Sequence, residues 1–178
     1  SCNWPCLPTC IAGSRAFVAG SVGPLGRPLD PRRLQLPELD AAFTEQITGL
    51  IEGGVDALCI ETQNNTVEML VAVRAARAIA PEMPVIALAT FAEEGRTLGG
   101  ETPEHVALSL GDTVDVVGAN CSEGPSDMLD TIERIATATS RKIAAMPNAG
   151  NPKLIDNRVV YLTSPEYLAE YARRFLFA

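Results

Sequence analysis

The chain has 178 residues, with 14 basic and 22 acidic side chains, a net charge of -8, and 47% hydrophobic residues. This profile is typical of one soluble globular domain with its own core. The acidic balance, without any basic stripe, argues against a nucleic-acid-binding protein. No apolar run reaches the roughly 20 residues of a membrane-spanning helix, and the first residues lack the pattern of a secretory signal. We therefore expect a cytoplasmic protein.

Segments of strand and helix character alternate along the chain. In chain order we expect strands and helices in turn at residues 16–19, 37–53, 56–60, 66–80, 84–89, 103–110, 114–119, 126–139, 142–146 and 165–175. A Gly- and Pro-rich loop follows the first strand, and a long loop follows the fifth. Asn64 or Asn65 is positioned to cap the second helix, and Ser164, followed by Pro165, to cap the last one.

This alternation predicts an α/β fold with a parallel sheet. The strands are almost continuously apolar, which predicts that both faces of the sheet are covered. Loops after the strands are longer and richer in Gly, Asn and Thr than loops after the helices, as in a (β/α) barrel. A doubly wound open sheet is the alternative, although no Gly-x-Gly-x-x-Gly follows the first strand. A full barrel has eight units in about 250 residues, so five units predict a partial barrel.

Polar and thiol side chains follow several of these strands. Cys121 stands at the end of the fourth strand in Gly118-Ala119-Asn120-Cys121-Ser122-Glu123-Gly124-Pro125, and Glu61 follows the apolar run that ends at Ile60. Thr90 and Asn148 also come directly after strands. Barrel enzymes carry their catalytic residues at this end of the strands, so these four are candidate site residues.

Each candidate also has a plainer interpretation. Cys121 suits a small buried position, Glu61 an acidic residue at a helix start, and Asn148 a turn. The segment Gly20-Ser21-Val22-Gly23-Pro24 lacks the Gly-Lys-Ser/Thr of a phosphate-binding loop. We therefore interpret this segment either as a tight turn or as part of a pocket wall in which Ser21 contacts the substrate.

The remaining cysteines and the single histidine give weaker signals. Five cysteines do not make a disulfide framework. Cys2, Cys6 and Cys10 fit no iron–sulfur spacing, and intervening prolines prevent a helix that would align them. We interpret residues 1–14 as an unrelated leader, Cys59 as a core residue and His105 as a solvated residue at a helix start.

Six segments carry a family resemblance in a fixed order. They are Val18–Gly26, Glu61-Thr62, Thr90-Phe91 with Gly95-Arg96-Thr97, Asn120–Pro125, Pro147–Gly150 and Ser164–Tyr167. Through them residues 15–178 resemble the homocysteine S-methyltransferase domain family, and within it the bacterial proteins fused to a methylenetetrahydrofolate reductase. The resemblance implies a partial (β/α)8 TIM-type barrel that holds roughly strands three to seven with their helices.

The resemblance also implies roles for the candidate residues. Cys121 would be one of three thiolates that hold zinc, which binds homocysteine sulfur as a thiolate at its open position. Glu61 would pair with the homocysteine ammonium, Ser21 and Thr90 would contact substrate, and Asn148 would lie at or beside the open position. The two further cysteine ligands of the family, in Gly-Gly-Cys-Cys-Gly, are absent from this chain, and Gln63 replaces an aromatic residue.

We therefore expect a zinc-dependent homocysteine S-methyltransferase domain that forms methionine and is inactive as this chain alone. The methyl donor, whether folate-linked, cobalamin, betaine or a methylsulfonium, stays open, and a reductase domain is the expected fused or separate partner. The alternative is a catalytically inactive barrel fragment with a structural or interaction role, because one thiolate and one amide fall short of a four-coordinate shell and exposed sheet edges favour association. A barrel enzyme with Cys121 as nucleophile is disfavoured, because only His105 would serve as its base.

Overall fold

The computed structural model describes residues 13, 15–26, 36–121, 124–150, 153–155, 157–161 and 163–178. Five parallel strands form one sheet in the order β1-β2-β3-β4-β5. They are β1 (Ala19–Val22), β2 (Ala57–Gln63), β3 (Val85–Ala89), β4 (Val116–Cys121) and β5 (Lys142–Pro147). Because every strand lies beside its neighbour in sequence, each helical crossover advances the sheet by one strand, as in a TIM-type barrel. The fold is therefore α/β, and the sheet is part of such a barrel.

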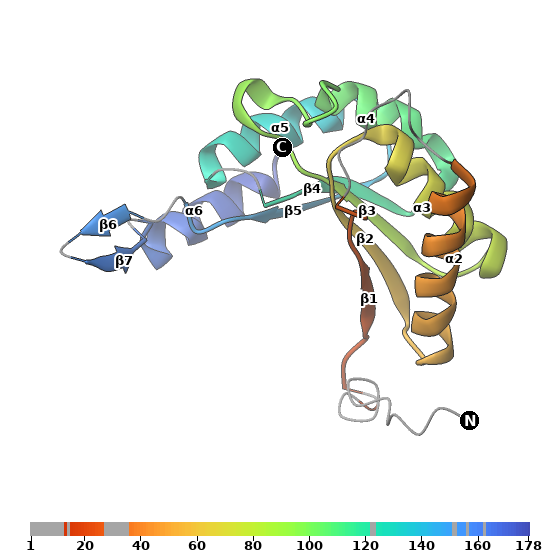
Figure 1. Ribbon diagram of the computed structural model, residues 1–178. Coiled ribbons are helices and arrows are strands. Elements are labelled where there is room, and N and C mark those ends of the chain that lie inside the picture. Colours follow the sequence, from red (N-terminus) through yellow and green to blue (C-terminus); the bar gives the residue numbers. More distant parts are fainter. Residues whose placement is uncertain are drawn as a thin grey trace.

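Helices cover the outer side of this curved sheet (Figure 1). They are α2 (Leu36–Glu52), α3 (Thr66–Ile79), α4 (Pro103–Leu110), α5 (Pro125–Ala138) and α6 (Pro165–Phe175), with short 3-10 turns η1 (Glu93–Gly95) and η2 (Gly111–Thr113). An antiparallel hairpin of β6 (Lys153–Ile155) and β7 (Arg158–Val160) projects away from the sheet after β5 (Figure 1). No helix among the described residues is long and apolar enough to cross a membrane.

Local sequence signals fix where the helices begin. The Asn65 side chain accepts a hydrogen bond of 2.8 Å from the Glu68 N–H at the start of α3. The Ser164 hydroxyl accepts one of 3.2 Å from Tyr167 N–H at the start of α6, where Pro165 occupies the first position. Each cap satisfies a backbone donor that has no partner within its helix. The predicted cap at Ser164 is confirmed, and Asn65 rather than Asn64 caps α3.

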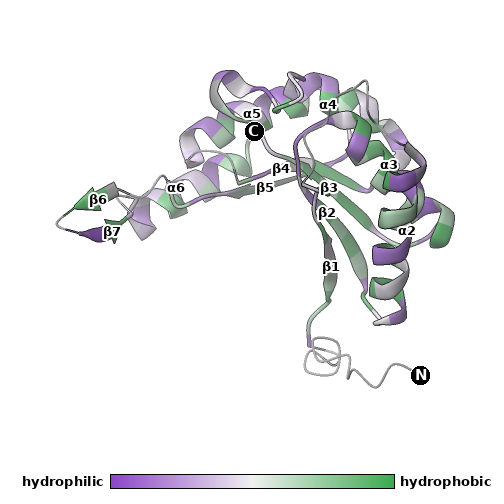
Figure 2. Ribbon diagram, viewed as in Figure 1, coloured by the Kyte–Doolittle hydropathy of each residue, from purple (hydrophilic) through white to green (hydrophobic). Residues whose placement is uncertain are grey.

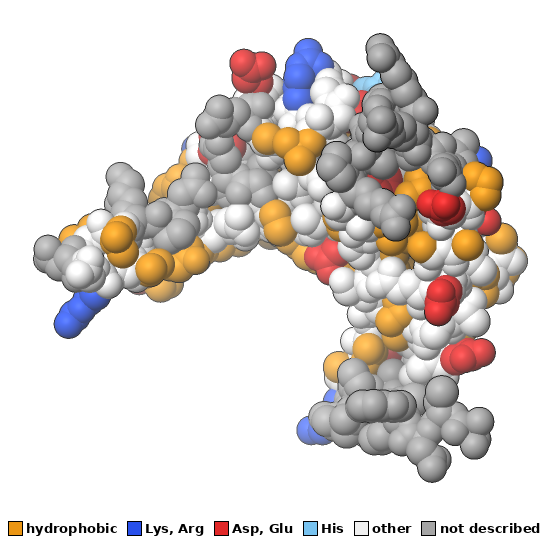
Figure 3. Space-filling model, in the orientation of Figure 1, with side chains coloured by type: hydrophobic (Ala, Val, Ile, Leu, Met, Phe, Trp, Pro, Cys, Tyr) orange, Lys and Arg blue, Asp and Glu red, His pale blue; other side chains and the backbone are white. Residues whose placement is uncertain are grey.

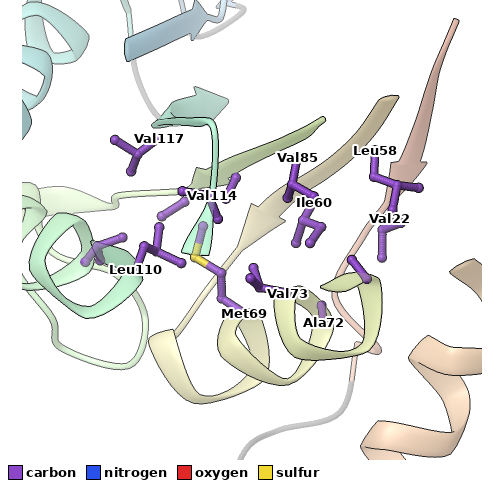
Figure 4. Packing of buried hydrophobic residues seen from close by; sticks show 14 of the residues in the cluster. Val22, Leu58, Ile60, Met69, Ala72, Val73, Val85, Leu110, Val114 and Val117 are labelled. Carbon is purple, nitrogen blue, oxygen red and sulfur yellow. The ribbon is translucent and has the colours of Figure 1, made fainter. Parts of the chain in front are cut away.

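The core lies between the outer face of the sheet and the helices. Side chains alternate between the two faces along each strand, so Leu58 and Ile60 of β2 share the outer face and belong to the same buried cluster as Met69 and Val73 of α3 (Figure 4). These side chains are almost fully buried. The apolar character follows the strands and the inner sides of the helices (Figure 2).

Three strand boundaries differ from the sequence prediction. β1 covers Ala19–Val22 instead of 16–19, because its ladder pairs with Ala57–Ile60, whereas Val18 N–H donates to the Asp56 carboxylate at 2.7 Å and Phe17 is 92% exposed. β2 and β4 each extend beyond the predicted end, through Gln63 and Cys121. The polar residues at these ends read as loop in sequence, yet they continue the strands.

The prediction that both faces of the sheet are covered is wrong for the described residues. On the inner face, Ser21 is exposed and Met146 is 48% exposed. The hairpin was expected to be loop, and hydrophobic side chains gather over it (Figure 3). The predicted leader, with Cys2, Cys6 and Cys10, lies outside the described residues apart from Gly13.

Candidate functional site

The ends of β2 and β4 meet although β3 lies between them. β3 stops at Ala89, which pairs with Gln63 on one side and Ala119 on the other. β4 runs two residues further, to Cys121. β2 bulges at Glu61 and Thr62, between its pairings of Ile60 with Ala87 and of Gln63 with Ala89, so these residues reach the end of β4 across the end of β3. This contact joins Glu61 and Thr62 of β2 to Asn120 and Cys121 of β4.

Asn120 is the centre of that contact, and its side chain is 3% exposed. Its Oδ1 accepts a hydrogen bond of 2.9 Å from Thr62 N–H. Its Nδ2 donates to Thr62 Oγ1 at 2.8 Å and to Glu61 Oε2 at 3.3 Å, and it also lies 3.4 Å from Cys121 Sγ. Because one amide offers one acceptor and two donor hydrogens, this single side chain orients three neighbours.

The Glu61 carboxylate is held on both of its oxygens. Ser21 Oγ donates to Oε1 at 2.6 Å, and Asn120 Nδ2 approaches Oε2. Within the described part of the chain, no Lys or Arg forms an ion pair with Glu61. Its carboxylate is therefore oriented by neutral donors, with no cation paired to it among these described residues, and this arrangement favours a cationic ligand group.

The backbone of Thr62 and Cys121 is left-handed, with φ of 59° at both residues. A β-branched residue such as threonine rarely adopts this conformation, and the cost is about 1–3 kcal/mol. The two Asn120 hydrogen bonds to Thr62 offset that cost. Thr62 Oγ1 lies 3.9 Å from Cys121 Sγ, so the two left-handed residues face each other.

Thr90, just after β3, hydrogen-bonds to the ends of both β2 and β4. Its Oγ1 donates to the Asn120 carbonyl at 3.1 Å, and its N–H donates to the Gln63 carbonyl at 2.9 Å. Asn148 lies at the same carboxyl end of the sheet, one residue past Pro147, which pairs with Cys121 in the ladder. The Asn148 side chain is exposed. The structure thus joins Ser21, Glu61, Thr90 and Cys121 through direct contacts with Asn120 or Glu61 and places Asn148 beside them along the edge.

Cys59 and His105 match their sequence interpretations. Cys59 is 8% exposed, and burial, with the nearby Glu61 charge, raises the pKa of its thiol to about 11. It is therefore a protonated core residue at neutral pH. His105 is exposed in the first turn of α4, and no contact joins it to Cys121 among the residues that the structure describes.

The described residues do not form a complete zinc site. No group of three or more His, Cys, Asp or Glu lies close enough to hold a metal among them. A catalytic zinc needs three protein ligands and an open position. Cys121 offers one thiol, and the Asn120 amide next to it presents an N–H donor to the sulfur, so this donor set falls short of what zinc requires.

Neither Asn120 nor Gln63 was assigned a role in the site from the sequence. Asn120 belongs to the motif around Cys121, and its position directly before that cysteine at a strand end was the signal that could have identified it as a site residue. Gln63 is fully buried, and its Oε1 has no hydrogen-bond partner within the described part of the chain. Its amide nitrogen makes only long contacts of 3.4 Å with the carbonyls of Val22 and Glu61.

Comparison with known proteins agrees with the resemblance seen in the motifs. The family model for homocysteine S-methyltransferases matches residues 8–178. The methionine synthases of Mycobacterium tuberculosis and Mycobacterium leprae are each 29% identical over 167 residues, which is 91% of this chain and 14% of theirs. The chain therefore spans only a small part of the curated relatives that it matches.

Solved structures with the same fold include the homocysteine methyltransferase MmuM from Escherichia coli. Its apo form has a TM-score of 0.70 and 20% identity, covering 95% of this chain and 56% of that one. Its metallated form has a TM-score of 0.66 and 18% identity, covering 94% and 57%. The fold likeness agrees with the family match over almost the whole chain, and the chain belongs to the homocysteine S-methyltransferase family.

Proposed function

We propose that this chain provides the homocysteine-binding side of a homocysteine S-methyltransferase site. The observation that carries the proposal is the network through Asn120, which joins the Glu61 carboxylate to the Cys121 thiol at the carboxyl end of the sheet. Family membership supports the reaction class, a methyl transfer to the sulfur of homocysteine that gives methionine.

The chemistry of homocysteine matches the groups at this end of the sheet. Its ammonium suits the Glu61 carboxylate, which Ser21 and Asn120 orient without neutralising it. A charge-assisted hydrogen bond of this kind is stronger than one between neutral groups. Homocysteine bound there would carry its thiol near Cys121, and Thr90 and Asn148 would line the same edge.

Zinc remains a proposal in which Cys121 is one ligand. The family is zinc-dependent in general, and a metallated form of MmuM has been solved. Among the described residues, Cys121 is the one thiol at the carboxyl end of the sheet, and the family's Gly-Gly-Cys-Cys-Gly motif does not occur in this sequence. We therefore expect the 178-residue chain alone to form no methionine.

The methyl donor and the cellular setting are proposals of the same kind. The motif resemblance to reductase-fused proteins favours a folate-linked methyl donor and a methylenetetrahydrofolate reductase as fused or separate partner. Cobalamin, betaine and methylsulfonium donors remain alternatives. We propose a cytoplasmic setting, and the acidic composition argues against nucleic-acid partners.

A second candidate function is a structural or interaction role without catalysis. The observation that favours it is the exposure of apolar side chains on the hairpin and beside it. They are Met146 at 48%, Leu154 at 72%, Ile155 at 46%, Val159 at 66% and Tyr161 at 54%. Contiguous exposed apolar surface is typical of interaction sites. The two candidates differ in whether the network at the sheet edge binds an amino acid.

Binding of L-homocysteine by the purified chain tests the first proposal. Calorimetry would compare L-homocysteine with 4-mercaptobutyrate, which keeps the thiol and the carboxylate but lacks the ammonium. We expect the wild-type chain to bind L-homocysteine more tightly, and Glu61→Gln to weaken that binding roughly 10- to 100-fold, the value of a hydrogen bond to a charged group. The same substitution should leave 4-mercaptobutyrate binding unchanged.

The alternative outcomes are equally specific. Equal affinity of the wild-type chain for both ligands would remove the proposed role of Glu61. Absence of binding to either ligand, in a chain whose thermal unfolding is cooperative, would overturn the proposed function and favour the interaction role.

A further inference from the structure

We propose that Asn120 is the positioning residue of this site, which fixes the Glu61 carboxylate and the Cys121 thiol relative to each other. The proposal rests on the proposed function for the roles of Glu61 and Cys121. It adds a residue whose side chain touches both and which has neither role itself.

The geometry requires the chemistry of an amide. Oδ1 accepts from the Thr62 N–H at 2.9 Å, while Nδ2 donates toward Glu61, Thr62 and Cys121 within 3.4 Å. An aspartate would keep the acceptor but would turn an anionic oxygen toward the Glu61 carboxylate and the sulfur. An alanine would lose every one of these contacts. At 3% exposure, water does not replace them easily.

The strained backbone supports a functional reason for this arrangement. Thr62 and Cys121 both have φ of 59°, on two strands that are not adjacent in the sheet. Strained residues persist only where surrounding contacts hold them, and they cluster at functional sites. Here the contacts that hold Thr62 come from Asn120, and Thr90 holds Asn120 in turn through its carbonyl at 3.1 Å.

Two readouts test the proposal in the purified 178-residue chain. The first is the exchange rate of the Thr62 amide hydrogen, measured by NMR. The second is the alkylation rate of Cys121 by iodoacetamide at one fixed pH, measured by mass spectrometry of tryptic peptides. Trypsin places Cys59 and Cys121 on different peptides, so the buried Cys59 serves as an internal reference for an intact fold.

Asn120→Asp separates positioning from packing. It keeps the acceptor for Thr62, so we expect amide exchange within about threefold of wild type. It replaces both N–H donors with an oxygen that repels the Glu61 carboxylate and the sulfur, so the contacts that fix Cys121 are lost and we expect its alkylation rate to differ from wild type by about tenfold. A residue that only packed the strand end would leave the rate close to that of wild type, because aspartate has almost the same volume as asparagine.

Two further variants complete the test. Asn120→Ala removes the acceptor, so Thr62 exchange should become about tenfold faster or more. Leu154→Ala, at an exposed position of the hairpin outside this network, is the control, and both rates should stay within about twofold of wild type. If the alanine variant does not fold, the isosteric aspartate variant still decides.

A Cys121 alkylation rate in Asn120→Asp that equals the wild-type rate would overturn the proposal. Wild-type protection of Thr62 in a folded Asn120→Ala chain would overturn it as well. Neither measurement uses homocysteine, a methyl donor or zinc, so its failure is distinguishable from failure of the proposed function.

Discussion

The carboxyl end of the sheet buries polar side chains, whereas the C-terminal part of the chain exposes apolar ones. At the ends of β2 and β4, polar residues such as Asn120 and Gln63 are buried. In the β6–β7 hairpin, apolar residues such as Leu154 and Val159 are 72% and 66% exposed, and α6 contains no buried residue. Burial of polar groups and exposure of apolar groups both cost folding free energy.

The difference separates a packed core from a C-terminal part whose side chains are mostly exposed. The apolar core joins β1 to β4 with α2 to α5, and the polar network stands directly on that core. Because hydrophobic burial supplies most of the folding free energy, we expect substitutions near the sheet to be costly and those in the hairpin to be mild.

Gly118→Ala should have the largest effect. A Cβ at Gly118 would overlap the carbonyl oxygen of Ala144 in the neighbouring strand β5, so β4 and β5 would have to separate. We expect at least about 3 kcal/mol of destabilisation, measured by urea denaturation. Gly49→Ala, in α2 with open space around it, is the matched control and should stabilise by about 0.5–1 kcal/mol. Similar denaturation midpoints for both variants would refute the tight approach of β4 to β5.

Ile60→Ala and Leu154→Ala compare the two regions directly. Ile60 is fully buried against the helices, so its truncation should cost about 2–5 kcal/mol. Leu154 is 72% exposed, so the same kind of truncation should cost less than about 0.5 kcal/mol. Differential scanning calorimetry of both variants would show the contrast. A comparable loss from Leu154→Ala would mean that the hairpin is part of the cooperative core.

Acid should lower the free energy of unfolding by protonating Glu104, which pairs with Arg134 between α4 and α5. Bidentate hydrogen bonds from Arg134, at 2.6 and 2.9 Å, lower the pKa of the Glu104 carboxyl to about 2. A carboxyl whose pKa is depressed by folding stabilises above its unfolded pKa of about 4.3 and loses that contribution as the pH falls toward 2. Because both side chains are more than a third exposed, we expect only about 1 kcal/mol.

Glu104→Gln provides the check on that pH dependence. Urea midpoints of the wild type and the variant should differ at pH 7 and converge near pH 2, because protonation removes the ion pair in the wild type. A difference that stays constant across this range would show that the pair does not contribute.

Gln63→Met should have the smallest effect, and of opposite sign. The Gln63 Oε1 is buried without a partner in the described part of the chain, and its nitrogen makes only 3.4 Å contacts. An apolar side chain of similar volume removes the unsatisfied oxygen, so we expect no change or a gain of about 1 kcal/mol. A loss above about 1 kcal/mol in thermal unfolding would show that a hidden donor satisfies the oxygen.

The fold was predictable because its signals are local. Alternating apolar periods, Pro at the first helical turns and the cap at Ser164 each act within a few residues, and the helices begin and end within one residue of the sequence prediction. Strand ends were less predictable. Glu61, Thr62 and Asn120 are polar and read as loop, yet cross-strand hydrogen bonds hold them in strands.

The site was predictable as a set of residues but not as a network. The sequence pattern places Ser21, Glu61, Thr90 and Cys121 at strand ends, and parallel strands bring those ends together. The contacts of Asn120 depend on the bulge of β2 at Glu61 and Thr62 and on β4 running past the end of β3, and no local pattern encodes either feature. The left-handed turns at Thr62 and Cys121 contradict local preference, so only tertiary contacts specify them.

NMR chemical-shift mapping with L-homocysteine tests the central claim most directly, because it reports on both regions in one experiment. The account predicts shifts at Ser21, Glu61, Thr62, Asn120 and Cys121 that saturate with ligand, with the hairpin residues Leu154 and Val159 unchanged. Shifts confined to the hairpin, or no shifts at the sheet edge at saturating ligand, would contradict the assignment of the Asn120 network as the homocysteine site.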